Sequence, residues 1–161
     1  MKDSKPIVLG INGFKKSGKT TLIERLLKVL AQQGLRLAVI KSHNEPVVTD
    51  KPGTDTDRFY RGGANVLSYD GQSVFIKQHQ KDAFGLEEAL IKIGNCYDLI
   101  LVEGFKESDI EKIWLLRKDE TKPPENILHI ITVLKWADEP QQRLEQALKL
   151  LQRRLGKLNE G

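Results

Sequence analysis

The sequence contains very little cysteine and no long apolar run. Cys96 is its single cysteine, which excludes an intrachain disulfide and favours a reducing compartment. No stretch approaches the roughly 20 apolar residues that a membrane-spanning helix needs. The apolar run Ile7–Ile11 near the N-terminus is too short for a signal peptide. We therefore expect a cytoplasmic protein with no membrane partner.

The chain also lacks a concentrated patch of one charge sign. Its 161 residues carry a net charge of +4, and the basic residues are scattered and often stand beside acids. A mild basic excess suits anionic ligands such as phosphates, and it does not predict nucleic acid binding. Apolar residues make up 39% and charged residues 30%, which predicts one folded domain over residues 1–161 rather than a disordered chain.

Apolar runs and turn-forming residues alternate along the chain. Short apolar runs predict buried strands at 7–11, 37–41, 99–102, 113–116 and 130–134. Amphipathic stretches predict helices at 20–33, 86–93 and 141–155. The first strand, helix and strand form a right-handed βαβ unit with a parallel sheet. We therefore predict a three-layer α/β fold of the P-loop NTPase type, with a mostly parallel sheet.

The polar region between the second and third buried strands has its own turn signals. Residues 66–69 and 73–77 flank Asp70-Gly71-Gln72 and predict a β-hairpin extension. A short helix precedes it, capped by Thr54 or Asp55 and ended at Gly62. The segment Ser73–Ile76 carries few charges. It is a candidate edge strand, covered either by a second copy of the chain or by a helix of the same chain.

A glycine-rich loop follows the first predicted strand. Residues 13–20 satisfy the P-loop pattern G-x-x-x-x-G-K-[ST]. Glycines let backbone N–H groups approach a phosphate, and the next helix points its positive dipole end at the same place. Lys19 would reach the β- and γ-phosphates, and Thr20 would offer its hydroxyl to Mg²⁺. We expect a purine nucleoside triphosphate to bind at Gly13, Lys15, Lys16, Ser17, Gly18, Lys19, Thr20 and Thr21.

Two acids flank the strand predicted at 99–102. P-loop proteins place a carboxylate beyond an apolar strand, where it meets Mg²⁺ directly or through water. Asp98 precedes this strand and Glu103 ends it. Ligands gather at the carboxyl ends of strands in open α/β sheets. We therefore assign Glu103 to the metal environment and Asp98 to the far side of the sheet.

Three stretches together resemble the molybdopterin-guanine dinucleotide biosynthesis adaptor family, MobB. One is the loop at 13–21. The second runs from Val39-Ile-Lys41 through His43 and Asp50-Lys-Pro-Gly53 to Asp55 and Arg61-Gly-Gly-Ala64, and the third is Leu99-Ile-Leu-Val-Glu-Gly-Phe-Lys106. Their order and spacing match over about residues 7–117. The family often has several histidines after the strand-two lysine, whereas this chain keeps only His43 there.

The resemblance implies GTP as the nucleotide, Mg²⁺ and a homodimer. It implies a helper role in attaching GMP to molybdopterin, beside a separate molybdopterin guanylyltransferase. Among the acids after the second strand (Asp50, Asp55 and Asp57), turns and a helix cap are the simpler explanation for any single one. Asp55 is the preferred metal candidate because it matches the family pattern. Catalytic residues stay unassigned, and without a clear water-positioning residue we expect weak or conditional GTPase activity.

The residues leave the base and the reaction open. Many GTP-binding P-loop proteins read guanine with Asn-Lys-x-Asp after a late strand, and Leu134–Asp138 lies in that region without the Asn or the spacing. Trp136 would stack on a base or serve as an ordinary core or surface tryptophan. One alternative function is a small-molecule kinase with Arg58 and Arg61 in a lid, and another is a nucleotide sensor without turnover.

Overall fold

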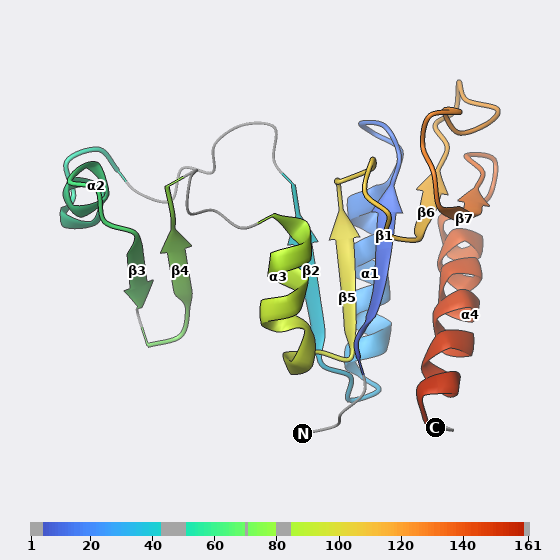
Figure 1. The fold of residues 1–161 in the computed structure, drawn as a ribbon. Helices are drawn as coiled ribbons and strands as arrows, with labels where there is room; N and C mark the ends of the chain where they lie inside the picture. Colours follow the sequence, from blue (N-terminus) through green and yellow to red (C-terminus); the bar gives the residue numbers. More distant parts are fainter. Residues whose placement is uncertain (1–4, 43–50, 70, 80–84, 160–161) are drawn as a thin grey trace. The chain divides into compact units, whose positions relative to one another are not determined.

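The apolar runs form a five-stranded sheet in the computed structural model, which describes residues 5–42, 51–69, 71–79 and 85–159. Its strands are β1 (Ile7–Asn12), β2 (Leu37–Lys41), β5 (Leu99–Glu103), β6 (Lys112–Leu115) and β7 (Ile130–Leu134), in the order β2-β5-β1-β6-β7. Each neighbouring pair is parallel. The carboxyl ends of all these strands therefore point to the same side of the molecule's sheet unit (Figure 1).

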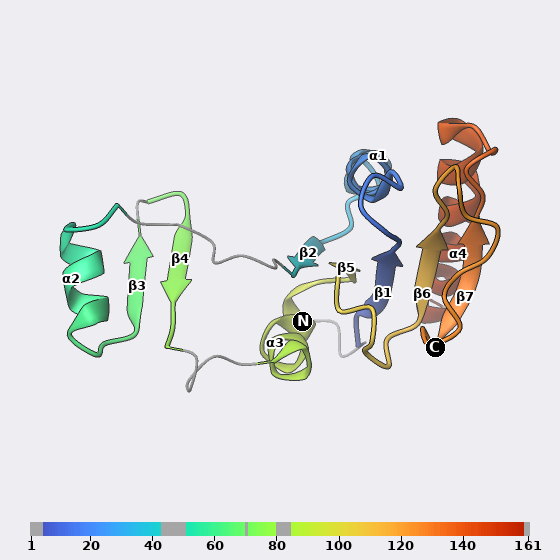
Figure 2. The same ribbon diagram turned by 90° about the horizontal axis from the view of Figure 1, so that it is seen from above.

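Helices lie on both faces of this sheet. In α1 (Lys19–Ala31) and α4 (Pro140–Asn159), apolar residues four apart share one helix face. Those faces join the strand side chains of one sheet face in a single core, which includes Leu26, Leu30, Ala147 and Leu151. The end of α3 (Leu86–Ile93) and the 3-10 turn η1 (Gly94–Cys96) lie on the side opposite α1 (Figure 2). The predicted α/β fold class is confirmed.

The strand β5 lies inside the sheet, whereas β2 and β7 are its two edge strands. Residues 99–102 are at most 1% exposed, because β5 has a neighbour on each side and side chains alternate between two covered faces. The prediction of a buried strand at 37–41 was wrong about burial. Among the described residues β2 pairs with β5 alone, and Val39 is 41% exposed. Strand order depends on distant parts of the chain, which the local apolar run does not encode.

The chain divides into two compact units. The sheet unit comprises Met1–Ser42 and Leu90–Gly161, and the hairpin unit comprises His43–Ala89. In the hairpin unit, α2 (Asp55–Arg61) precedes an antiparallel hairpin of β3 (Val66–Tyr69) and β4 (Val74–Lys77). Both elements match the sequence prediction. None of the described helices in either unit has the length and apolar character needed to cross a membrane.

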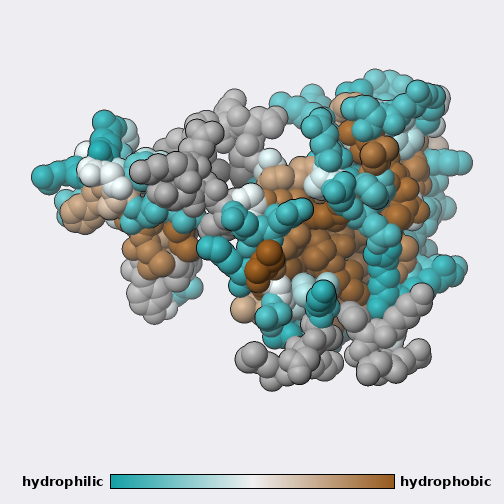
Figure 3. Space-filling view, in the orientation of Figure 1, coloured by the Kyte–Doolittle hydropathy of each residue, from teal (hydrophilic) through white to brown (hydrophobic). Residues whose placement is uncertain are grey.

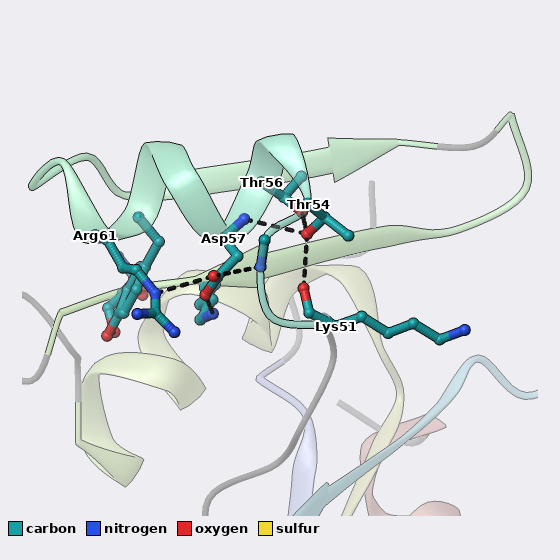
Figure 4. A network of polar contacts seen from close by, with 9 residues as sticks. Lys51, Thr54, Thr56, Asp57 and Arg61 are labelled. Carbon is teal, nitrogen blue, oxygen red and sulfur yellow. Dashed lines mark hydrogen bonds and ion pairs between the residues drawn. The ribbon is translucent and has the colours of Figure 1, made fainter.

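A local polar network fixes the first turn of α2 (Figure 4). Thr54 Oγ1 accepts a hydrogen bond from the Asp57 amide at 3.4 Å and donates to the Lys51 carbonyl oxygen at 3.0 Å. The Asp57 carboxylate accepts from the Gly53 amide at 2.9 Å and pairs with Arg61 Nε at 2.9 Å. The cap is therefore Thr54, and Asp57 is a structural residue of this turn.

Candidate functional site

The loop between β1 and α1 turns through backbone conformations that favour glycine. Gly13 has a φ of 148° and Gly18 a φ of 92°, and Lys16 also lies in the left-handed region with a φ of 66°. A Cβ atom at Gly13 would lie 2.5 Å from the Leu115 carbonyl oxygen. The first amides of α1 have no side-chain cap at Gly18. They remain available to an anion held by the loop.

Lys19, the first residue of α1, folds back over this loop. Its Nζ atom donates a hydrogen bond to the Phe14 carbonyl oxygen at 2.7 Å. Burial lowers the pKa of Lys19 below the usual lysine value, and the positive charges of Lys41 and Lys106 lower it further. The negative charge of Glu103 raises this pKa and so opposes the shift. The loop therefore presents an ammonium group in a strongly basic neighbourhood, which suits a polyanion.

Glu103 lies at the loop side of the sheet. In the sheet register it stands between Ile11 of β1 and Lys41 of β2. Its carboxylate is 14% exposed and lies 3.8 Å from Lys41 Nζ. Asp98 directly precedes the strand at its other end and pairs with Arg36 Nη2 at 2.8 Å. The two acids thus occupy the opposite ends of β5 that the sequence predicted.

A tight turn after Glu103 brings another cation toward the loop. Gly104 has a φ of 94°, and a Cβ atom there would lie 2.6 Å from Ser42 Cβ. Asn12, a buried residue at the end of β1, donates from Nδ2 to the Gly104 carbonyl oxygen at 2.8 Å. Beyond the turn, Lys106 Nζ lies 5.5 Å from the centre of the Phe14 ring. Asn12 therefore ties the turn to the strand that leads into the phosphate loop.

The other residues expected at the phosphate site come from the same loop and helix start. Lys15, Lys16, Thr20 and Thr21 are exposed, whereas Ser17 is fully buried and its Oγ atom has no hydrogen-bond partner among the described residues. Thr20 lies one residue into α1, at the loop side of the sheet unit where Glu103 also lies. The loop residues and Glu103 thus all lie in the sheet unit, at the carboxyl ends of its strands.

Asp55, the preferred metal ligand among the acids that follow β2 in the sequence, does not lie in the sheet unit. Asp55 belongs to the hairpin unit, where its carboxylate is 84% exposed and lies 3.8 Å from Arg58 Nη1. Asp50 lies outside the described residues. No cluster of three or more His, Cys, Asp or Glu side chains suited to a metal occurs in the described ranges. Mg²⁺ commonly binds through one or two protein ligands together with substrate phosphates, so the role of Asp55 stays a prediction.

Sequence reasoning missed Arg143, which is buried behind the loop. Its side chain is 8% exposed, and its guanidinium donates to the carbonyl oxygens of Ser17 at 3.0 Å, Leu116 at 3.2 Å and Lys135 at 2.6 Å. Burial lowers the pKa of Arg143, against the opposing effect of Asp138. One signal was available: Arg143 stands four residues before Ala147, in the apolar stripe of α4.

This arrangement can be compared with known proteins. The family model described as molybdopterin guanine dinucleotide synthesis protein B, MobB, matches residues 8–136. The chain belongs to the MobB family. The molybdopterin-guanine dinucleotide biosynthesis adapter protein of Haemophilus influenzae is 35% identical over 130 residues, which cover 78% of this chain and 72% of the relative. The family prediction made from the three sequence stretches is confirmed.

Coverage differs among relatives and solved structures. A relative from Methanocaldococcus jannaschii is 41% identical over 117 residues, and the match covers 68% of this chain but 47% of that relative. A crystal structure of a MobB homolog from Bacillus stearothermophilus has a TM-score of 0.66 at 19% identity, covering 93% of this chain and 98% of the other. A crystal structure of molybdopterin-guanine biosynthesis protein B has a TM-score of 0.65 at 26% identity, covering 91% and 99%.

Proposed function

We propose that this chain binds GTP and Mg²⁺ and acts in the cytoplasm as an adaptor for attaching GMP to molybdopterin, with weak or conditional GTPase activity. Membership of the MobB family supports the pathway, and the name of the Haemophilus influenzae relative supports the adaptor role. We further propose that the chain forms a homodimer and works beside the molybdopterin guanylyltransferase of the same pathway.

The phosphate loop is the observation that carries the nucleotide part of this proposal. Gly13 and Gly18 both have positive φ angles that favour glycine, and a Cβ atom at Gly13 would also clash with the Leu115 carbonyl oxygen. Lys19 lies over the loop, and among the described residues its ammonium group donates a hydrogen bond to a neutral acceptor, the Phe14 carbonyl oxygen. A bound phosphate group would replace this neutral acceptor of the Lys19 ammonium group with a charged one. Hydrogen bonds between charged groups are stronger than those with a neutral acceptor.

The residues around the loop also fit a magnesium ion that is shared with the nucleotide. Thr20 is exposed in the first turn of α1, and Glu103 lies at the neighbouring strand end. A hydroxyl, a carboxylate and phosphate oxygens are the hard ligands that Mg²⁺ prefers. When bound, the ion would neutralise charge that develops on the phosphate oxygens. Lys41, 3.8 Å from Glu103, would hold this carboxylate in place.

The kinase alternative relied on Arg58 and Arg61 as lid residues. In the hairpin unit, Arg61 Nε pairs with Asp57 at 2.9 Å and Arg58 Nη1 lies 3.8 Å from Asp55. These arginines already have local acidic partners, so the contacts favour a structural role for them. Incubation with γ-labelled GTP and a metabolite panel distinguishes the two functions. A kinase transfers the label to a metabolite, whereas a GTPase releases it as phosphate.

The nucleotide proposal is tested with Lys19→Ala. We expect its affinity for a non-hydrolysable GTP analogue with Mg²⁺ to fall by about 2–5 kcal/mol, the usual cost of leaving a buried charge unpaired. Isothermal titration calorimetry measures the change. Lys28→Ala is the matched control, because Lys28 is exposed in the last turn of the same helix. Equal affinities in the folded wild type and Lys19→Ala would remove Lys19 from the binding site.

The adaptor role needs a separate test with the guanylyltransferase. Purified molybdopterin guanylyltransferase, molybdopterin and GTP are incubated with or without this chain, and formation of the dinucleotide is measured. We expect the wild-type chain to raise the rate or yield and Lys19→Ala to lose that effect. A chain that binds GTP but leaves dinucleotide formation unchanged would retain the nucleotide proposal and refute the adaptor role.

A further inference from the structure

A cavity of about 390 Å³ adjoins the phosphate loop in the sheet unit. One wall comes from the start of α1 and includes Gly18 and Thr21. The other comes from the segment between β7 and α4 and includes Trp136, Ala137 and Asp138. The volume lies within the roughly 300–1,000 Å³ typical of ligand pockets. Because Gly18 belongs to both features, a ligand whose phosphates occupy the loop can extend into this cavity.

The sheet topology explains why these distant segments meet. β7 lies next to β6, and β6 lies next to β1, with all three strands parallel. The segment after β7 therefore emerges at the same edge as the phosphate loop after β1. Ligands of open α/β sheets bind at this edge, outside the carboxyl ends of the strands.

Arg143 fixes the two walls of the cavity relative to each other. Its guanidinium donates to Ser17 on the phosphate-loop side, and to Lys135 on the other side at 2.6 and 2.8 Å. It also lies 5.4 Å from the centre of the Trp136 ring. A buried side chain that bonds to both walls lowers the ordering cost of binding, because the cavity is already formed.

The lining offers an aromatic face and a carboxylate. Trp136 is 44% exposed, so part of its ring remains open to contact. Asp138 is partly buried, and its Oδ2 atom accepts from the Lys135 amide at 3.3 Å and from Gln146 Nε2 at 3.2 Å. Those two contacts orient the carboxylate. An ionised carboxylate accepts hydrogen bonds and cannot donate them.

This chemistry distinguishes the purine bases. Guanine presents two adjacent donors, the N1–H group and the N2 amino group, which match the two oxygens of one carboxylate. Adenine presents the N1 lone pair at the corresponding position, which a carboxylate would repel. A base edge without donors would remove water from the carboxylate without replacing the lost hydrogen bonds, and that is costly.

We propose that this cavity is the base subsite, in which Trp136 stacks on the purine and the Asp138 carboxylate selects guanine. The proposal rests on the proposed function, because it places the phosphates of the same nucleotide in the loop at 13–20. It assigns guanine preference to Asp138, which stands outside the usual Asn-Lys-x-Asp spacing.

The test compares nucleotides in the full chain and in Asp138→Asn. An asparagine keeps one oxygen for the bonds from Lys135 and Gln146, so this variant is expected to fold. Its amide donates where the carboxylate accepted, which suits the O2 atom of xanthine and opposes the guanine amino group. We expect GTP affinity to fall roughly tenfold or more relative to ATP, as for lost hydrogen bonds to a charged group. We expect XTP affinity to rise.

Two controls separate the base subsite from the phosphate site. Glu145→Gln removes a carboxylate from α4 outside the cavity lining and should leave every affinity unchanged. Inorganic triphosphate has no base, so its affinity should not change in Asp138→Asn but should fall in Lys19→Ala. If the wild type binds GTP and ATP equally, or if Asp138→Asn keeps the wild-type ratio, the base proposal is overturned while the phosphate site stands. If the wild type binds neither triphosphate, both proposals are overturned.

Discussion

At the scale of single residues, the metal site depends on two side chains from different elements. Thr20 comes from the first turn of α1 and Glu103 from the end of β5. We expect Thr20→Ala and Glu103→Gln each to weaken the Mg²⁺ dependence of GTP-analogue binding. The double variant should lose less than the sum of the single losses, because both residues would serve one ion. Calorimetric titrations over a range of Mg²⁺ concentrations measure the four affinities.

Asp98→Asn is the control for that experiment. Asp98 directly precedes the same strand and pairs with Arg36 at the end opposite to Glu103. Its substitution should leave the Mg²⁺ dependence unchanged. A larger effect from Asp98→Asn than from Glu103→Gln would contradict the assignment of the metal to the carboxyl ends of the strands. Fully additive effects of Thr20→Ala and Glu103→Gln would show that the two residues do not share an ion.

Individual residues also show what the sequence can and cannot predict at the site. The loop at 13–20 was predictable because its residues are consecutive in the sequence and their pattern is typical of a phosphate-binding loop. The position of Glu103 at the carboxyl end of β5 was predictable because this residue directly follows an apolar run. Arg143 was not, because its partners are backbone carbonyl oxygens at sequence separations of 126, 27 and 8 residues. Every residue carries such an oxygen, so no residue type marks the acceptor.

At the scale of elements, local signals predicted the helices and strands and the burial of β5 and β6, but not the exposure of β2. Thr54 was predictable as a helix cap because its partner, Asp57, lies three residues away. The hairpin was predictable from its turn residues. The edge position of β2 was not predictable, because it depends on β5, which begins far along the chain. An apolar run indicates a strand without specifying how many neighbours the strand will have.

The first turn of α2 should be sensitive to acid. The Gly53 amide, followed by the hydrogen bond and charge of Arg61 and the charge of Lys77, lowers the pKa of Asp57 below its usual value. A carboxyl whose pKa is lower in the folded state adds stability that is fully present above its unfolded pKa of about 3.9. That stability is lost as the pH falls through the folded pKa. We expect the amides of α2 to lose hydrogen-exchange protection below about pH 4.

The comparison with Asp57→Asn and Asp55→Asn makes this prediction specific. Asp57→Asn should already have lower protection at neutral pH and a flatter dependence on acid. Asp55→Asn should behave like the wild type, because the Asp55 carboxylate is 84% exposed. Protection factors for α2 that stay constant down to pH 2 in the wild type would show that the Asp57 network does not stabilise this turn.

At the scale of the whole molecule, the hairpin unit leaves apolar surface open. Leu67 and Ile76 are cross-strand partners and are 63% and 59% exposed. The neighbouring pair contains Lys77, which lies 3.9 Å from Asp57 of α2. Side chains alternate across a sheet, so Leu67 and Ile76 face away from α2. Figure 3 shows exposed apolar atoms over this hairpin. A two-stranded hairpin is marginally stable alone, which favours a partner surface.

We expect that partner to be a second copy of the chain. Sedimentation at low micromolar concentration should give a mass near twice the 18.3 kDa of one chain. Ile76→Glu should shift the protein to monomers, because a charge would be buried in an apolar contact. Ile91→Glu is the matched control, since Ile91 is 78% exposed on α3 rather than on the hairpin. A monomeric wild type would refute the dimer, and a dimer that persists in Ile76→Glu would place the contact elsewhere.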